Sequence, residues 1–336
     1  MSAPRISIVT PSYQQASYLE ECIDSLHQEG YGAAMEHIVV DGGSTDGSKA
    51  IIERNAGKFA WWCSENDRGQ SDAINKGLEH ATGEVFSWLN SDDALLPGVL
   101  RDVAQAFATD PDLLVFGGTL NYIGSGPPPE ARINDARDTH RLFCDPIVNQ
   151  PATFWRMDVM RTIGGVDPAL RYVMDLELWW QFLFRYGPEH MRFEATPFAA
   201  FRLHDESKTT TQHSGFLREM ATILHGLCGR TGNEDVANVI ALGYPERPAL
   251  RGIPANGKEH HAIVRDMSIH FLLKWHGHIH TEAEFNMMQA LHHGDFTSQV
   301  RLLPGMAERW AKARLTVDGT TWNRYRVRRK LKHLFG

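Results

Sequence analysis

Two adjacent carboxylates, Asp92 and Asp93, follow a short apolar run and are the first residues whose pattern indicates chemistry. Two acids held side by side repel each other unless a cation neutralises them. Hard divalent cations take oxygen ligands and share them with substrate phosphates. The alternative is that one of the two acids caps a following helix, which is the more common role of an isolated Asp-Asp pair.

A third acid, Asp41, ends another apolar run and precedes Gly42 and Gly43. A carboxylate in this place can accept a hydrogen bond from a base or a ribose hydroxyl, and the glycines let the backbone approach a ligand closely. An ordinary turn explains the same residues. A phosphate-binding P-loop is excluded, because Ser48-Lys49 stands where Lys must directly follow a glycine.

Asp175 and Glu177 begin a segment that is rich in aromatic residues, including Trp179 and Trp180. Residues two apart on a helix face different sides, so only one of these acids can point into a given site. A carboxylate beside aromatic rings could have a raised pKa, as a general base requires. The alternative is that both acids interact with the helix dipole.

The elements that must position these acids alternate along the first half of the chain. Apolar runs predict four buried strands, at 6–9, 37–40, 59–63 and 84–89. Amphipathic spacing predicts helices between them, at 18–29, 44–56 and 71–80. This alternation indicates a parallel sheet covered on both faces, in which ligands bind beyond the carboxyl ends of the strands. Three polar clusters follow three of these strands, so a shared crevice favours a ligand role for Asp92 and Asp93.

The alternation stops at about residue 206, after a predicted strand at 193–201. Helices are predicted beyond it, at 217–227, 262–274 and 282–292. We therefore expect two domains: an α/β domain over 1–205 and a mainly helical region with a basic tail over 206–336.

The composition excludes several classes of protein. With 336 residues, 42% of them hydrophobic and 22% charged, the chain is typical of a globular protein and not of a disordered one. The net charge of −7 argues against a nucleic-acid partner. No run approaches the roughly 20 apolar residues of a membrane helix, and no signal peptide is predicted. The four cysteines form no metal or disulfide spacing, which favours a reducing cytoplasm.

Six segments resemble, in order and spacing, the family 2 glycosyltransferases of the GT-A fold. They are 6–13, 39–47, 64–77, 88–93, 164–167 and 174–179. The resemblance implies a mostly parallel, Rossmann-like sheet with helices on both faces. It also implies an inverting, hexosyltransferase-like reaction that moves a sugar from a nucleotide-diphosphate sugar, UDP-sugar first, to a hydroxyl of a glycan or glycolipid, with Mn²⁺ or Mg²⁺.

The resemblance further implies roles for single residues. The nucleotide and donor side would be formed by Thr10, Pro11, Tyr13, Asp41, Asp72, Asn75 and Asp92. Arg68 joins them because its cation could balance a diphosphate, although a lone Arg is more often a surface residue. Asp93 and His204 would hold the metal, with Ser91 at the first position of the family's DXD motif. Asp175 would be the catalytic base, with Met174 where the family has Glu.

Two other functions stay open: a nucleotide-sugar-binding module without catalysis, and a nucleotidyltransferase. The presence of Asp175 together with Asp92 and Asp93 argues against the first. The loop at 10–16 argues against the second, because it lacks the glycine-rich, basic character of nucleotidyltransferase loops.

Residues 324–335 form a basic tail on an acidic chain. Six Lys and Arg residues between Arg324 and Lys332 are interleaved with apolar ones, which on a helix gives a cationic face beside an apolar one. We expect this tail to contact an anionic membrane, so that a cytoplasmic enzyme is held at the inner face. The alternative is a disordered, solubilising end. The sequence does not predict the oligomeric state.

Overall fold

The structure is a computed structural model. It describes residues 3–28, 34–124, 128–204, 213–275, 279–294, 296 and 299–335, with side chains as far as 328. Packing divides the chain into two compact units. One unit is Met1–Thr139 with Ile147–His213, and the other is His140–Pro146 with Ser214–Gly336. The expected division into domains 1–205 and 206–336 stays a prediction, and the packing adds that 140–146 goes with the second unit.

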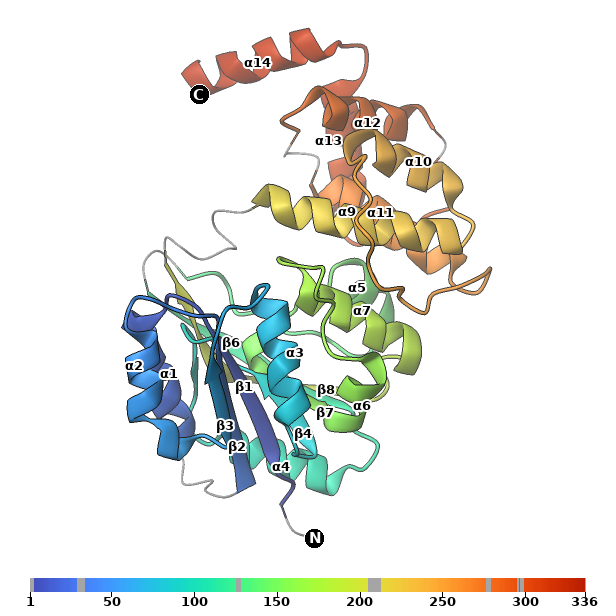
Figure 1. The fold of residues 1–336 in the computed structure, drawn as a ribbon. Coiled ribbons are helices and arrows are strands. Elements are labelled where there is room, and N and C mark those ends of the chain that lie inside the picture. The colour runs from blue at the N-terminus through green and yellow to red at the C-terminus, as the bar shows by residue number, and fades with distance from the viewer. Residues whose placement is uncertain are drawn as a thin grey trace. The chain divides into compact units, whose positions relative to one another are not determined.

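An eight-stranded sheet forms the centre of the first unit (Figure 1). Its strands are β1 (Ile6–Ser12), β2 (Met35–Asp41), β3 (Trp61–Ser64), β4 (Val85–Trp88), β5 (Ala94–Leu95), β6 (Val115–Gly124), β7 (Thr153–Arg156) and β8 (Met191–Leu203). Their order across the sheet is β3-β2-β1-β4-β7-β6-β8-β5. Strands β1 to β4 run parallel, so their carboxyl ends share one edge, whereas β7 is antiparallel to both of its neighbours.

Helices cover both faces of this sheet. They are α1 (Ala16–His27), α2 (Ser48–Arg54), α3 (Gln70–His80), α4 (Val99–Thr109), α6 (Met157–Ile163) and α7 (Met174–Tyr186). Successive side chains of β1 point to opposite faces. Ile6 and Ile8 pack with residues of α1 and α4 on one face. On the other face α3 lies so close to Val9 that a Cβ added at Gly77 would come within 2.4 Å of it. The expected α/β class is confirmed.

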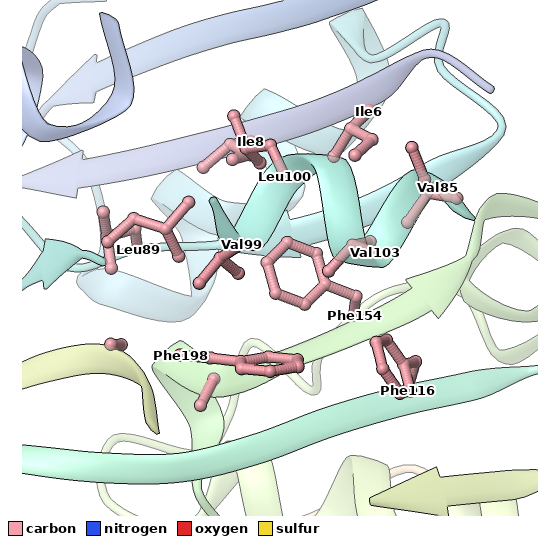
Figure 2. Close-up of a cluster of buried hydrophobic side chains, with 14 of the residues drawn as sticks. Ile6, Ile8, Val85, Leu89, Val99, Leu100, Val103, Phe116, Phe154 and Phe198 are labelled. Carbon is pink, nitrogen blue, oxygen red and sulfur yellow. The ribbon is translucent and has the colours of Figure 1, made fainter. Parts of the chain in front are cut away.

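The main core lies between the sheet and α4. Val99, Leu100 and Val103 of α4 face Ile8 and Phe154 across this cluster, and all are buried (Figure 2). Burying one such side chain contributes about 1.5–3 kcal/mol. The core therefore holds β4 and its neighbouring strands firmly, and with them the loops that leave the edge where the carboxyl ends meet.

The second unit is helical, as expected. Its helices are α5 (Thr139–Cys144), α9 (His213–Arg230), α10 (Glu234–Gly243), α11 (His261–Lys274), α12 (Glu282–His293), α13 (Met306–Val317) and α14 (Trp322–Phe335). A buried contact of 2.9 Å between His140 Nε2 and Asp266 Oδ2 joins α5 to α11. Among the residues that the structure describes, no helix is long and apolar enough to span a bilayer.

Candidate functional site

The polar clusters lie at neighbouring strand ends, as the parallel sheet requires. In the register of the sheet Ser12 is paired with Asp41, Asp41 with Ser64, and Val9 with Trp88. The loop 89–93 leaves β4 directly after Trp88. The structure thus brings Asp41 and the acids of the β4 loop to the carboxyl-end edge of adjacent parallel strands, where ligands bind in open α/β sheets.

Asp93 is a buried carboxylate with one oxygen left unbonded. Its side chain is 2% exposed, and its Oδ1 accepts a hydrogen bond of 3.0 Å from the backbone N–H of Arg202. Its Oδ2 is buried and has no hydrogen-bond partner among the described residues. Burial and the negative charge of Asp92 raise the pKa of Asp93 well above its usual value. A cation at Oδ2 would relieve both effects.

Asp92 is bonded to His204, whose Nε2 lies 3.0 Å from Asp92 Oδ2. The sequence predicted His204 as a metal ligand together with Asp93, and this role stays a prediction. Among the described residues no three His, Cys, Asp or Glu side chains gather as a ready-made metal cage. A divalent cation held by one or two carboxylates and completed by substrate phosphates needs no such cage. The unbonded Oδ2 of Asp93 beside Asp92 therefore fits a cation that binds together with a diphosphate.

Asp41 is already engaged with its own neighbourhood. It is fully buried and accepts hydrogen bonds from the Ser44 N–H (3.0 Å), from the Ser44 hydroxyl and from the Ser64 hydroxyl (2.6 Å). A carboxylate offers about four acceptor positions, so these bonds use most of the acceptor capacity of Asp41. Asp41 is therefore not simply a carboxylate open to a nucleoside. Its bonds to Ser44 stabilise the turn after β2, and its bond to Ser64 connects that turn to β3.

The three expected nucleoside contacts, Thr10 and Pro11 within β1 and Tyr13 just after it, differ in exposure. Thr10 and Pro11 are buried, and the Thr10 hydroxyl lies 3.0 Å from His37 Nε2. Burial and His27 keep the pKa of His37 well below its usual value, so this ring is neutral. Tyr13 is 61% exposed. Of the three side chains, only that of Tyr13 therefore offers a large surface to a ligand.

Arg68 and Asp72 neutralise each other. Arg68 Nη2 lies 2.6 Å from Asp72 Oδ1, and the Arg68 backbone N–H donates to Asp72 Oδ2 at 3.2 Å. The hydrogen bond from Arg68 lowers the pKa of Asp72. The charge of Arg68, in the loop before α3, is thus shared with Asp72 of α3, and its expected role at a diphosphate stays a prediction.

Asn75 holds a loop rather than presenting a free amide. Its Nδ2 donates to the Val166 carbonyl at 2.8 Å, and the Val166 N–H donates to its Oδ1 at 3.0 Å. The Ser71 hydroxyl donates to the Leu170 carbonyl at 2.7 Å. These bonds tie the segment that leads into α7 to α3. A donor-binding role for Asn75 stays a prediction, and the bond from Ser71 to Leu170 was not predicted from the sequence.

Asp175 and Glu177 have different surroundings on α7. Asp175 is half-buried in the first turn, and its Oδ1 accepts from the Leu176 N–H at 2.8 Å. Glu177 is 1% exposed and accepts from Gln181 Nε2 at 2.6 Å. Gln181 in turn accepts from Arg185. Asp175 is therefore the acid of the two that solvent, and hence an acceptor, can reach.

A chain of amide side chains supports the β4 loop, and sequence reasoning missed it. Gln70 Nε2 donates to Asn90 Oδ1 at 2.7 Å, and Asn90 Nδ2 lies 3.5 Å from Gln150 Oε1. Gln150 Nε2 donates to the Trp88 carbonyl at 2.6 Å. Gln150 lies in the 3-10 turn η3 (Gln150–Ala152). The only sign of this chain in the sequence was that Gln70 and Asn90 stood within two of the polar clusters.

Comparison with known proteins places the chain among sugar-transferring enzymes. It matches the family model described as Glycosyl transferase family 2 over residues 7–163. An uncharacterised glycosyltransferase of Mycobacterium tuberculosis is 36% identical over 183 residues, which are 52% of this chain and 68% of the relative. A PGL/p-HBAD biosynthesis glycosyltransferase of Mycobacterium bovis is 30% identical over 190 residues, 55% of this chain and 70% of the relative.

Two solved structures share the fold. Residues 1–349 of TarS from S. aureus, in complex with UDP-GlcNAc, superpose with a TM-score of 0.62 at 15% identity, covering 94% of this chain and 90% of that one. A mannosyltransferase of Pyrobaculum calidifontis, in complex with GDP-Man and Mn²⁺, gives a TM-score of 0.50 at 19% identity, covering 97% and 83%. The expected GT-A fold is confirmed by these likenesses.

Proposed function

The chain belongs to glycosyl transferase family 2, and we propose that it moves a sugar from a UDP-sugar to a hydroxyl of a glycan or glycolipid, with inversion and with help from a divalent cation. The observation that carries this proposal is the buried, unbonded Oδ2 of Asp93 beside Asp92 at the end of β4. A nucleotidyltransferase is set aside, because the family relationship is to glycosyltransferases.

The donor would lie over the ends of β1 and β2. The exposed ring of Tyr13 can stack on a nucleobase, whereas a ligand hydrogen bond to Asp41, which is fully buried, would require the Ser44 turn to move aside. UDP is preferred as the nucleotide because TarS, which shares the fold, was solved with UDP-GlcNAc. Thr10 and Pro11 would contribute backbone and shape rather than exposed side chains.

Asp93 would hold the divalent cation through Oδ2, with Asp92 and His204 beside it. When bound, such a cation stabilises the negative charge that develops on the departing diphosphate. Mn²⁺ or Mg²⁺ fits this oxygen-rich pair, and the mannosyltransferase with the shared fold was solved with Mn²⁺. Asp92 orients its carboxylate through the 3.0 Å contact with His204 Nε2.

Asp175 would act as the general base. Its carboxylate removes the proton from the acceptor hydroxyl while that oxygen forms a bond to C1 of the donor sugar. The bond between C1 and the diphosphate oxygen breaks on the opposite face, and the electron pair leaves with UDP. A single displacement of this kind inverts the configuration at C1. Ser71 and Asn75 form hydrogen bonds to the segment that directly precedes α7, and these bonds would hold the start of α7 in place for this step.

A hydrolysis screen tests the proposal. The protein is incubated with UDP-, GDP- and dTDP-sugars in Mn²⁺, and the released nucleotide is measured. We expect UDP release from at least one UDP-sugar, its loss in EDTA, and its loss in Asp93→Ala with the fold retained by circular dichroism. Absence of nucleotide release from every donor would contradict a transferase active on these donors, and full wild-type activity in EDTA would contradict the cation.

We also propose that α14 rests on an anionic membrane surface on the cytoplasmic side. Arg324, Arg326 and Arg328 are exposed, as is Val327 between them. Trp322 and Tyr325 are half-buried, and their rings pack against Phe285 of α12, which attaches the first turn of the helix to the second unit. A lipid-linked acceptor would give this contact a purpose.

A further inference from the structure

Arg202 contacts both acids of the β4 loop. It lies near the end of β8, and its backbone N–H donates to Asp93 Oδ1 at 3.0 Å. Its side-chain Nε donates to the main-chain carbonyl of Asp92, also at 3.0 Å. One residue thus fixes a carboxylate oxygen of one acid and the backbone of the other.

The Arg202 guanidinium is in turn anchored on α1. Its Nη2 lies 2.6 Å from Glu21 Oε2, and its central carbon lies 4.9 Å from the centre of the Tyr18 ring. The Tyr18 ring also packs on the ring of His204, with centroids 5.3 Å apart. The Arg202 side chain is only 16% exposed, so this arrangement is partly shielded from water, where charged hydrogen bonds are stronger.

We propose that Arg202 is a positioning residue that presents Asp93 Oδ2 to the divalent cation. Because the backbone N–H of Arg202 occupies Oδ1, Oδ2 is the oxygen left for a ligand. Because the guanidinium donates a hydrogen bond to the Asp92 carbonyl, it fixes the orientation of the backbone that carries both carboxylates. This inference rests on the proposed function, since it assigns the cation to Asp93.

The geometry needs arginine rather than any cation. The planar guanidinium donates in two directions at once, to the Asp92 carbonyl and to Glu21, while its face stacks on Tyr18. A lysine ammonium is a compact charge and lacks the rigid, planar set of N–H donors of arginine. Partners that orient a metal ligand in this way are worth about 10–100-fold in metal affinity.

A matched control is available in Arg156 of β7. Its Nε donates to the Leu113 carbonyl at 2.9 Å, its Nη2 donates to the Phe107 carbonyl at 3.0 Å, and its guanidinium lies 5.1 Å from the Phe107 ring centre. Arg156 is paired with Val85 at the start of β4, at the opposite end of the strand from the site. Replacing Arg156, like replacing Arg202, removes a side-chain hydrogen bond to a main-chain carbonyl and a cation–ring contact, but without touching Asp92 or Asp93.

The experiment measures Mn²⁺ binding to the full chain in the presence of UDP, by calorimetry and by the electron paramagnetic resonance signal of free Mn²⁺. We expect Arg202→Met to weaken Mn²⁺ binding by about 10–100-fold, Arg202→Lys to recover part of it, and Glu21→Gln to weaken it less. Arg156→Met should bind Mn²⁺ like the wild type, although its melting temperature falls.

Equal Mn²⁺ affinity in Arg202→Met and wild type would overturn the role of Arg202 but not the proposed function. The same would follow if Arg156→Met lost as much Mn²⁺ affinity as Arg202→Met. If Arg202→Met does not fold, Arg202→Lys and Glu21→Gln decide, and wild-type affinity in both overturns it. A wild-type chain that does not bind Mn²⁺ with UDP would overturn the proposed function, and the role of Arg202 with it.

Discussion

Asp175 and Glu177 stand two positions apart on α7, and their environments give them different expected roles. Replacing Asp175 with Asn keeps its shape but removes the proton acceptor, and loss of a general base costs about 10²–10⁴-fold in kcat. Affinity for UDP should be unchanged, because the residue is proposed to face the acceptor. Glu177→Gln is the matched control: its carboxylate is buried against Gln181, so kcat should stay close to wild type. The opposite pattern in the two variants would assign the base to Glu177.

His37 predicts how stability depends on pH. The ring is buried between Thr10 and His27, and its pKa in the folded protein is held well below the usual value. The unfolded chain therefore binds more protons than the folded one below pH about 6.5, and folding loses stability as the pH falls through that range. The contribution of His37 is fully present above that pH.

Urea unfolding between pH 7 and pH 5 measures this effect, taking the slope of unfolding free energy against pH. His37→Gln should flatten the slope without abolishing it, since burial also lowers the pKa values of His27 and His270. An identical slope in wild type and variant would show that His37 titrates alike in the folded and unfolded chains.

At the scale of elements, α3 holds the segment that leads into α7. Asn75→Ala leaves the buried N–H and carbonyl of Val166 without their partners, which costs about 1–3 kcal/mol of unfolding free energy. The start of α7 loosens with it, so kcat should fall while the KM for the donor stays constant. A raised donor KM at constant kcat would instead support the donor contact predicted from the sequence.

Asn134→Ala supplies the control for that change. The Asn134 amide bonds both the N–H and the carbonyl of Ile147, at 3.0 and 2.6 Å, in a segment that does not lead into α7. It should lose comparable stability in urea while kcat stays near wild type. Equal loss of kcat in both variants would attribute the effect of Asn75 to stability alone.

The sequence predicted individual strands and helices well, because each depends on the pattern of apolar residues within its own short segment. Alternating apolar runs marked β1, β2, β3 and β4, and helical spacing marked α1 and α3. The reversal at β7 was not predicted, because it depends on pairing between β4 and residues more than sixty positions away. Period and length cannot encode such long-range pairing.

The candidate site shows the same limit at the level of contacts. Motif order predicted Asp41, Asp93 and Asp175 as site residues, because their place after a predicted strand or at a helix start is visible in the chain. It could not show that the Asp41 carboxylate would accept hydrogen bonds from Ser44 and Ser64, because those hydroxyls come from two different segments. Arg202 lies beside His204 in the sequence but was given no role, because its partners on α1 and in the β4 loop are distant in sequence.

At the scale of the whole molecule, charge is unevenly distributed. The chain carries −7 overall, yet the segment from Arg324 to Lys332 has six Lys and Arg residues and no acid. Each basic residue close to an anionic membrane surface is worth about 1 kcal/mol. The attraction weakens with salt, because exposed charges are screened over about 8–10 Å near physiological ionic strength. A tail of this kind would give reversible attachment.

Co-sedimentation with liposomes tests this attachment in the full chain. Wild type should pellet with vesicles that contain phosphatidylserine at low salt, release as salt rises, and stay in solution with neutral vesicles. Replacing Arg324, Arg326 and Arg328 with Gln should move the release to lower salt, while Trp322 and Tyr325 keep α14 attached to Phe285. The charge-matched control replaces three exposed cations of α13 with Gln: Arg309, Lys312 and Arg314. Equal weakening in both variants would show that net charge rather than α14 drives binding, and no pelleting of wild type would favour a soluble acceptor.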